Sequence, residues 1–296
     1  MNYSTTDFTL GILGGGQLGK MLLQVTSRLS IKTNVLDPSD DSPCKEMCSE
    51  FTKGQLMDFD AVYNFGKKCD VVTYEIEHVN VDALEKLERN GVNVYPDSKT
   101  LKIIQDKSTQ KDFFLKNNIP TANHKYFKSL KDLENIKYPC VRKKTKFGYD
   151  GYGVKILKSK EDFKNLPETE FIIEDLIPFK KELATTVARN KSGQIEIFPI
   201  VEMMFNETSN QVEYVLCPAQ ISPELNERAK KIALKVSESF KQVGLLAVEM
   251  FLTHDNKILI NTKDINDIWD SFKEFDTNNT NIITDLKKND EYSILS

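Results

Sequence analysis

Two short segments hold eight of the thirteen glycines in this 296-residue chain, and each could bring backbone amides close to a ligand. In the first segment, Gly14, Gly16 and Gly19 follow an apolar strand with the spacing G-x-G-x-x-G and lead into an amphipathic helix. The next strand ends in Asp37, eighteen residues after Gly19. Free amides at a helix N-terminus favour anion binding, and Asp37 also permits the NAD site of an oxidoreductase. The alternative is a tight turn of the kind found in any open α/β domain.

The second glycine segment lies between two strands, so it is not a P-loop. One strand carries Lys143 into the loop, and another strand leaves it. Such a loop can close over phosphates as a flap, while Lys143, Lys144 and Lys146 neutralise the phosphate charge. An ordinary hairpin turn with solvated lysines is the alternative, although an aromatic residue is unusual at a hairpin tip. The flap residues are Gly148, Tyr149, Asp150, Gly151, Tyr152, Gly153 and Val154.

A carboxylate stands in the middle of an apolar hairpin that is predicted over residues 245–261. The strand over residues 245–252 alternates with period two, which places Glu249 on the face opposite to Val248 and Met250. A buried carboxylate needs a cation, a hydrogen-bond donor or a proton, and Mg²⁺ bridging nucleotide phosphates would supply the cation. Asn261 lies across the hairpin as a second oxygen ligand. The alternative is that Glu249 faces solvent on a half-exposed sheet.

Two more carboxylates stand where ligands commonly bind. The run from Phe171 to Glu182 contains an apolar strand, a short linker and a carboxylate. A linker between two lobes can hold an adenine ring through its backbone groups, and Glu182 can accept hydrogen bonds from ribose hydroxyls. Glu75 falls at the carboxyl end of an earlier strand, where open parallel sheets bind ligands.

The elements that must position these residues change in kind along the chain. Strands alternate with helices up to residue 97, which predicts a parallel α/β domain. One helix is then predicted over residues 98–117. After it, consecutive strands and one helix over residues 222–243 predict an antiparallel sheet. The predicted strands cover residues 138–143, 153–157, 171–174, 182–188, 195–202, 245–252 and 257–261.

The composition limits the class of protein. Forty per cent of the residues are apolar, which is enough for the cores of roughly two domains. A net charge of −4 with mixed signs argues against a nucleic-acid partner. We find neither an apolar run of membrane-spanning length nor an export signal, and five scattered cysteines indicate reduced thiols. We therefore expect a cytoplasmic protein.

In their order along the chain, these motifs resemble those of N5-carboxyaminoimidazole ribonucleotide synthetase, an ATP-grasp ligase of purine biosynthesis. The matching segments are GILGGGQLGKM, VVTYEIEHV, QDKSTQKDFF, KFGYDGYGV, FIIEDLIPFKKE and GLLAVEMFL. The resemblance implies an α/β fold, with a Rossmann-like pre-ATP-grasp domain followed by a two-lobed α+β ATP-grasp domain. The implied parts are the first domain over residues 1–97, a small lobe over 98–173, a large lobe over 174–261 and an atypical tail over 262–296.

The resemblance also implies a reaction in which ATP, bicarbonate and 5-aminoimidazole ribonucleotide give the N5-carbamate, ADP and phosphate through carboxyphosphate. Tyr149, Asp150 and Glu75 would face the ribonucleotide, while Glu249 and Asn261 would bind Mg²⁺. Members of the family form homodimers, so we expect a homodimer that acts on small molecules and engages neither nucleic acid nor membrane. The implied nucleotide-binding residues are Lys107, Lys143, the flap residues Gly148 to Val154, Glu174, Asp175, Leu176, Ile177, Glu182 and Asn261.

The sequence departs from the family pattern after the hairpin. Asn261 is followed by Thr262, where the family has a glutamate that serves as the second magnesium carboxylate. The family's next substrate-binding run does not follow either, and residues 262–296 contain no Gly, Ala, Val or Pro, which suggests a different origin. We expect ATP binding to survive weakly and ligase turnover to be severely reduced. The alternative function is a catalytically defective nucleotide-binding remnant.

Overall fold

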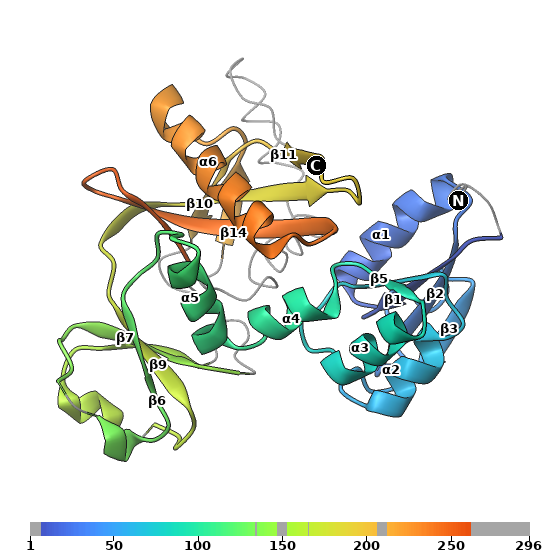
Figure 1. The fold of residues 1–296 in the computed structure, drawn as a ribbon, viewed down its shortest axis with the longest axis horizontal. Helices are drawn as coiled ribbons and strands as arrows, with labels where there is room; N and C mark the ends of the chain where they lie inside the picture. Colours follow the sequence, from blue (N-terminus) through green and yellow to red (C-terminus); the bar gives the residue numbers. More distant parts are fainter. Residues whose placement is uncertain (1–6, 134, 147–152, 165, 206–211, 262–296) are drawn as a thin grey trace. The chain divides into compact units, whose positions relative to one another are not determined.

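The chain folds as two compact units. The first comprises Met1–Lys102 with Gln242–Gly244, and the second comprises Ile103–Lys241 with Leu245–Ser296. In the described part of the chain, no helix is long and apolar enough to span a membrane. The computed structural model, drawn in Figure 1, describes residues 7–133, 135–146, 153–164, 166–205 and 212–261.

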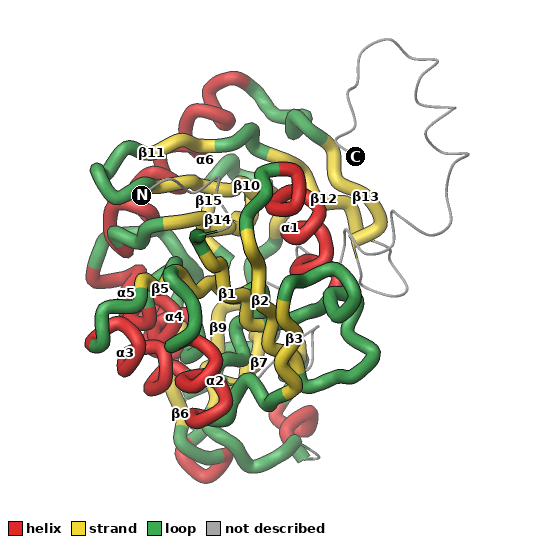
Figure 2. Tube along the Cα trace, turned by 90° about the vertical axis from the view of Figure 1, so that its right-hand side faces the viewer, coloured by secondary structure: helices red, strands yellow, loops and turns green. Residues whose placement is uncertain are grey.

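The first unit is built on a parallel sheet. Its strands lie in the order β3-β2-β1-β4-β5, and each neighbouring pair runs parallel. The tube view shows β1, β2 and β3 side by side (Figure 2). This arrangement confirms the α/β fold expected for the N-terminal part. The strands are β1 (Thr9–Leu13), β2 (Lys32–Asp37), β3 (Glu50–Lys53), β4 (Val71–Tyr74) and β5 (Asn93–Val94).

Helices cover both faces of this sheet, because alternate strand residues point to opposite sides. Ile12 and Val35 pack with Leu23 of α1 on one face. Leu13 and Leu36 face the other way and pack in the cluster that contains the buried residues of α2 and α3. The helices are α1 (Gln17–Arg28), α2 (Phe59–Gly66) and α3 (Val81–Arg89).

Two helices replace the single helix predicted over residues 98–117, so that prediction was wrong. They are α4 (Ser98–Ile104) and α5 (Lys107–Lys116). The break has a local cause in Asp106, whose Oδ1 accepts hydrogen bonds from the amides of Ser108 and Thr109 at 3.0 and 3.1 Å. This side-chain cap satisfies amide donors that have no partner within the helix, so a new helix begins after Asp106.

The second unit contains a small antiparallel sheet in the order β6-β9-β7-β8. One of its faces packs on an apolar cluster that includes Phe127, Cys140 and Phe171. Two 3₁₀ turns, Leu130–Asp132 and Lys160–Phe163, connect its strands. The strands are β6 (His124–Phe127), β7 (Cys140–Lys144), β8 (Val154–Leu157) and β9 (Phe171–Asp175).

A larger sheet completes the second unit in the order β13-β12-β10-β14-β15, with β11 paired to β10. Strand β10 pairs with β11 and β12, β12 pairs with β13, and β14 pairs with β15, all of them antiparallel, as the run of consecutive strands predicted. The strands are β10 (Phe179–Arg189), β11 (Ile195–Ile197), β12 (Val201–Phe205), β13 (Val212–Leu216), β14 (Gly244–Thr253) and β15 (Ile258–Ile260).

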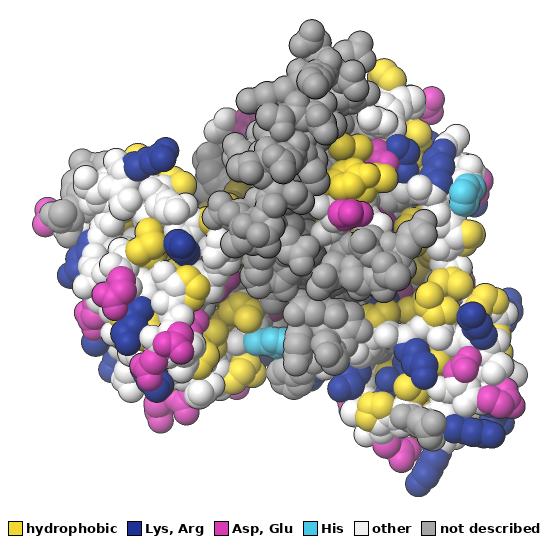
Figure 3. Space-filling model, turned by 180° about the vertical axis from the view of Figure 1, so that it is seen from behind, with side chains coloured by type: hydrophobic (Ala, Val, Ile, Leu, Met, Phe, Trp, Pro, Cys, Tyr) yellow, Lys and Arg dark blue, Asp and Glu magenta, His cyan; other side chains and the backbone are white. Residues whose placement is uncertain are grey.

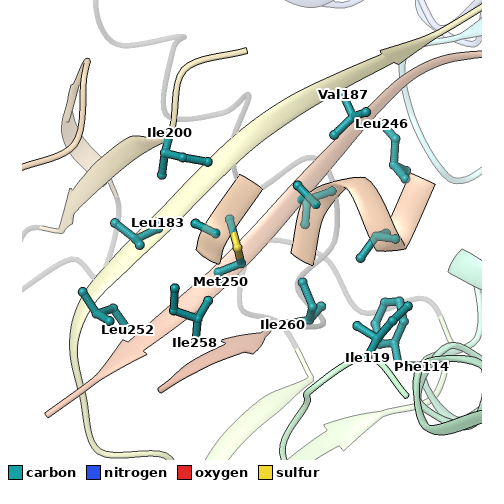
Figure 4. Close-up of a cluster of buried hydrophobic side chains, with 14 of the residues drawn as sticks. Phe114, Ile119, Leu183, Val187, Ile200, Leu246, Met250, Leu252, Ile258 and Ile260 are labelled. Carbon is teal, nitrogen blue, oxygen red and sulfur yellow. The ribbon is translucent and has the colours of Figure 1, made fainter. Parts of the chain in front are cut away.

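Helix α6 (Pro223–Phe240) covers one face of the large sheet. Its small residues Ala229 and Ala233 pack in one buried cluster with Leu183 of β10 and with Val248 and Met250 of β14. Leu183 and Met250 are labelled in the close-up of this cluster in Figure 4. The residues between these positions along β10 and β14 therefore point to the opposite face of the sheet.

The cysteines and surface charges agree with the composition. All five cysteines lie in the described residues and carry thiols rather than disulfides. Acidic and basic side chains are intermixed on the face of the molecule seen in Figure 3.

Candidate nucleotide-binding site

A lysine and a glutamate face each other across the small sheet. In the pairing of β7 with β9, Lys143 lies opposite Ile172, and Val141 lies opposite Glu174, so Lys143 and Glu174 share one face. The Nζ atom of Lys143 is 3.0 Å from Oε2 of Glu174, and both side chains are buried. Burial raises the pKa of Glu174, but the ammonium groups of Lys143 and Lys111 outweigh this and hold that pKa below its usual value.

The same lysine reaches the large sheet. Its Nζ lies 3.4 Å from Oδ1 of Asn261, which follows β15. The backbone amide of Asn261 donates to the carbonyl oxygen of Glu249 at 3.0 Å, so Asn261 lies across the hairpin from Glu249 as predicted. Residues that were predicted from two distant motifs thus meet where the two sheets approach each other.

Glu249 is 7% exposed, and the alternative of a solvent-facing carboxylate on a half-exposed sheet is therefore wrong. The predicted alternation of β14 is confirmed, because Val248 and Met250 pack in the cluster beneath α6 and Glu249 points to the other face.

Glu182 stands on the same side of the large sheet as Glu249. Its neighbour Leu183 packs beneath α6, so Glu182 faces away from that helix, and β10 lies beside β14. Glu182 is buried and pairs with Met203 of β12. Met203 belongs to a second apolar cluster that includes Ala247. This face thus combines two buried carboxylates with an apolar surface, which suits a nucleotide with a flat base and polar sugar.

The linker between the small sheet and the large sheet contains the other residues that we expect to contact the adenine base. Asp175 is exposed, and its Oδ2 accepts a hydrogen bond from Nδ2 of Asn123 at 2.7 Å. Leu176 and Ile177 are half-buried and connect β9 to β10. Because the side chain of Glu174 is held by lysines, only backbone groups of Glu174 are suited to contact an adenine ring.

Lys107 and the base of the flap are attached to the end of β7. Lys107 is buried, and its backbone amide donates to the carbonyl oxygen of Thr145 at 2.8 Å. At the far side of the flap, Gly153 has φ +98°, and its carbonyl accepts from the amide of Lys144 at 2.9 Å. Val154 is exposed. The remaining predicted flap residues lie outside the described part of the structure; they are Gly148, Tyr149, Asp150, Gly151 and Tyr152.

Two amides of the glycine loop in the first unit are already bonded to carboxylates. The amide of Gly15 donates to Oδ2 of Asp37 at 2.7 Å, and the amide of Gly16 donates to Oε1 of Glu75 at 3.0 Å. A phosphate at these two amides would meet two carboxylates, so an anion is disfavoured there, and an anion cradle at the amides of the first helical turn stays a prediction. Gly14 has φ +101°, and a Cβ atom there would lie 2.6 Å from Oε1 of Glu75. Glycine is favoured because side chains rarely tolerate this φ, and a Cβ atom would in addition displace the Glu75 carboxylate.

The residues present fit a magnesium ion that is bound together with a nucleotide. The Glu249 carboxylate and the Asn261 amide oxygen are hard donors, on β14 and directly after β15, and both residues are 7% exposed. Within residues 7–261, apart from the short segments not described, no group of three or more His, Cys, Asp or Glu residues forms a metal cluster. A magnesium ion here would therefore take further ligands from phosphates and water, as is usual for this ion.

One buried lysine of the site was not singled out from the sequence. Lys111 of α5 is 1% exposed, and its Nζ lies 3.2 Å from Oε1 of Glu174. Burial lowers the pKa of Lys111 to about 8, and the nearby charge of Lys143 adds to this, whereas Glu174 opposes it. The available signal was the four-residue spacing from Lys107, which places both lysines on the buried face of α5 with Phe114.

Comparison with known proteins agrees with this geometry. Residues 8–105 match the ribonucleotide synthetase preATP-grasp domain, and residues 112–263 match the ATP-grasp domain. The N5-carboxyaminoimidazole ribonucleotide synthase of Staphylococcus aureus (strain COL) is 33% identical over 277 residues, which cover 88% of this chain and 71% of that protein. The chain belongs to the N5-carboxyaminoimidazole ribonucleotide synthetase family.

Other members of the family and its relatives extend the likeness. The N5-carboxyaminoimidazole synthase of Aspergillus clavatus, solved with ADP and 5-aminoimidazole ribonucleotide, has a TM-score of 0.75 and 32% identity. That match covers 86% of this chain and 68% of the Aspergillus chain. The chloroplastic phosphoribosylaminoimidazole carboxylase of Vigna aconitifolia is 36% identical over 266 residues, 86% of this chain and 47% of that protein. The chain thus spans about half the length of such relatives.

Proposed function

We propose that this chain binds ATP with Mg²⁺ and takes part in the ATP-dependent carboxylation of 5-aminoimidazole ribonucleotide by bicarbonate, a step of purine biosynthesis. The observation that carries the proposal is the meeting of Lys143, Asn261 and Glu249 where the small and large sheets approach each other. The names of the relatives and the ligands of the Aspergillus structure support it.

We assign each residue of the site a part from the family resemblance and from its charge. Lys143 and Lys107 bind phosphate oxygens, and the flap from Gly148 to Val154 covers them. Backbone groups of the linker Glu174, Asp175, Leu176 and Ile177 hold the adenine, and Glu182 accepts hydrogen bonds from the ribose. Glu249 and Asn261 hold Mg²⁺, which when bound neutralises charge on the phosphates.

The proposed reaction requires the protein to neutralise charge and to align the reactants more than to take a covalent role. The bond from the γ-phosphorus to ADP breaks, and a bond from that phosphorus to a bicarbonate oxygen forms, which gives carboxyphosphate. The bond between the carboxyl carbon and the phosphate oxygen of carboxyphosphate then breaks, which releases CO₂ and inorganic phosphate. The amine nitrogen of the ribonucleotide bonds to the carbon of CO₂ and loses one proton, which gives the N5-carbamate. Lys143 lies beside Glu174 in a buried setting, where its charge acts on phosphate oxygens with little screening by water.

We propose that Glu75 contacts the ribonucleotide. The amide of Gly16 orients the Glu75 carboxylate, which can accept hydrogen bonds from an amine or hydroxyl. By the same likeness, we propose a cytoplasmic homodimer that acts on small molecules.

A measurement of ADP release tests the proposed reaction. The full chain is incubated with Mg-ATP, and ADP is followed with bicarbonate and 5-aminoimidazole ribonucleotide present together or omitted singly. The proposal predicts that ADP release requires both compounds. Release that is indifferent to both, in a chain that binds ATP, would contradict it.

The sequence around Asn261 favours a second candidate, a nucleotide-binding remnant with defective catalysis. Thr262 follows Asn261 where the family resemblance places a magnesium-binding glutamate, and Thr262 lies outside the described residues. This candidate predicts saturable Mg-ATP binding without ADP release. The proposed ligase predicts both, at a reduced rate.

A further inference from the structure

We infer that Lys111 is a positioning residue of the nucleotide site, which keeps Lys143 available for phosphates and fixes the strand end that carries Asn261. The inference rests on the proposed function, because it assigns a task within the same site. Lys111 touches neither phosphate nor metal in this proposal, and it acts through Glu174 and Thr121.

The first part of the argument is the charge balance around Glu174. Its two carboxylate oxygens are divided between two lysines, with Lys111 3.2 Å from Oε1 and Lys143 3.0 Å from Oε2. The three buried groups together carry one net positive charge. Without Lys111, the charges of Lys143 and Glu174 would cancel, and the carboxylate would hold Lys143 more tightly. Part of the positive charge that attracts a polyphosphate, beside that of Lys107, therefore depends on Lys111.

The second part is a chain of hydrogen bonds to the edge of the large sheet. The ammonium of Lys111 donates to Oγ1 of Thr121 at 2.6 Å, and this hydroxyl donates to the carbonyl oxygen of Ile260 at 3.1 Å. The amide of Ile260 donates to the carbonyl oxygen of Pro120 at 2.7 Å, and Thr121 pairs with Ile260 as a parallel bridge. Ile260 immediately precedes Asn261, so Lys111 is linked to both partners of the contact between Lys143 and Asn261.

The side chain of Lys111 is 1% exposed, so Lys111 cannot act at the protein surface. A purely structural ion pair would also be buried, and its loss would lower stability and weaken every ligand alike. A positioning role makes a different prediction. Loss of Lys111 should then weaken binding of a nucleoside triphosphate more than binding of a nucleoside monophosphate.

The test compares two nucleotides in the full chain. Binding of AMP and of AMP-PNP, a nonhydrolysable ATP analogue, is measured by calorimetry with Mg²⁺ in the wild type and in Lys111→Met. We expect the affinity for AMP-PNP to fall about tenfold or more and that for AMP to change less than about threefold. In the double variant Lys111→Met/Glu174→Gln, the net charge is restored, and AMP-PNP should bind more tightly than to Lys111→Met.

Arg142→Met is the matched control. Arg142 is a buried cation on the same strand as Lys143 but on its other face, where it donates to the carbonyl oxygen of Pro167 at 2.9 Å and stacks on Phe171. This variant should lose stability while its ratio of AMP-PNP affinity to AMP affinity stays at the wild-type value. The inference is overturned if Lys111→Met leaves that ratio unchanged, or if Glu174→Gln does not improve binding in the double variant.

Thr121→Val keeps the test decisive if Lys111→Met fails to fold. It removes only the hydroxyl between Lys111 and Ile260, and we expect a selective loss of AMP-PNP affinity of about threefold. An unchanged ratio in this variant would overturn the inference. If the wild type binds neither nucleotide, the proposed function itself fails, which is a different result from equal loss of both ligands in Lys111→Met.

Discussion

The ammonium of Lys143 lies 3.4 Å from the amide oxygen of Asn261, although the two residues are 118 positions apart in the chain. This contact joins the small sheet to the hairpin that carries Glu249. It puts a cation, a carboxylate and an amide oxygen within one buried region, which is what binding of a metal-bound polyphosphate requires.

Replacing Lys143 should remove most of the phosphate binding. We expect Lys143→Met to weaken AMP-PNP binding by about 100-fold and AMP binding by about fivefold or less, because a buried charge-assisted bond to phosphate is lost. Fluorescence competition or calorimetry measures both. Lys125→Met, which changes an exposed lysine of the same sheet, should leave both affinities at the wild-type value. Equal effects of the two substitutions would argue against a phosphate at Lys143.

The Mg²⁺ requirement of nucleotide binding should be set by the carboxylate of Glu249. In Glu249→Gln, the Mg²⁺ concentration for half-maximal AMP-PNP binding should rise about tenfold, since a neutral amide oxygen is a weaker ligand than a carboxylate. Binding is titrated with Mg²⁺ at fixed nucleotide concentration. Glu196→Gln on β11 is the control, because that side chain is exposed. A metal requirement that does not change in Glu249→Gln would place the metal elsewhere.

The buried cysteines of the first unit should make stability fall in alkali. Burial raises the pKa of Cys44 and of Cys69 from 9.0 to about 12. Unfolding therefore releases protons between these values, and the stabilising effect, complete below the unfolded pKa, is lost as pH rises through this window. As the pH rises from about 8 to about 10, each thiol should lower the free energy of unfolding by roughly 1 kcal/mol.

Urea unfolding of the wild type and of Cys44→Ala/Cys69→Ala at several pH values checks the thiol prediction. The double variant should be less stable at about pH 8, because alanine leaves small cavities, but should show a shallower decline with pH. Parallel declines in the two proteins would show that other groups cause the alkaline loss.

The rate of turnover should change with the side chain at position 262, directly after Asn261. Since the family resemblance places a magnesium-binding glutamate there, Thr262→Glu should raise ADP release in the presence of bicarbonate and 5-aminoimidazole ribonucleotide by about tenfold or more. Thr262→Gln has nearly the same size without the charge and serves as the control. An equal rate for both variants and the wild type would mean that the missing carboxylate does not limit turnover.

The repeating patterns of the sequence predicted the main elements well. Period-two alternation correctly separated Glu249 from Val248, and strand–helix alternation predicted the parallel sheet of the first unit. Short elements without a strong pattern were missed, including β3, β6, β13 and α2. The break at Asp106 was also missed, because helical spacing continues through it and only the capping side chain marks the new start.

The ionic contacts of the site were less predictable than its strands. Lys111 and Glu174 lie 63 positions apart, and their pairing depends on how α5 packs on β9 rather than on any local pattern. The bonds of two glycine-loop amides were unpredictable for the same reason, since Asp37 and Glu75 reach Gly15 and Gly16 only once three parallel strands are side by side. Spacing identified the loop, but the tertiary contacts decide what its amides bind.

A crystal structure of the full chain with AMP-PNP and Mn²⁺ in place of Mg²⁺ tests the central claim most directly, because anomalous scattering locates the metal. The account predicts one Mn²⁺ bonded to the Glu249 carboxylate and to Oδ1 of Asn261, with the phosphates bound to Lys143. A metal or triphosphate bound away from these three residues would contradict it.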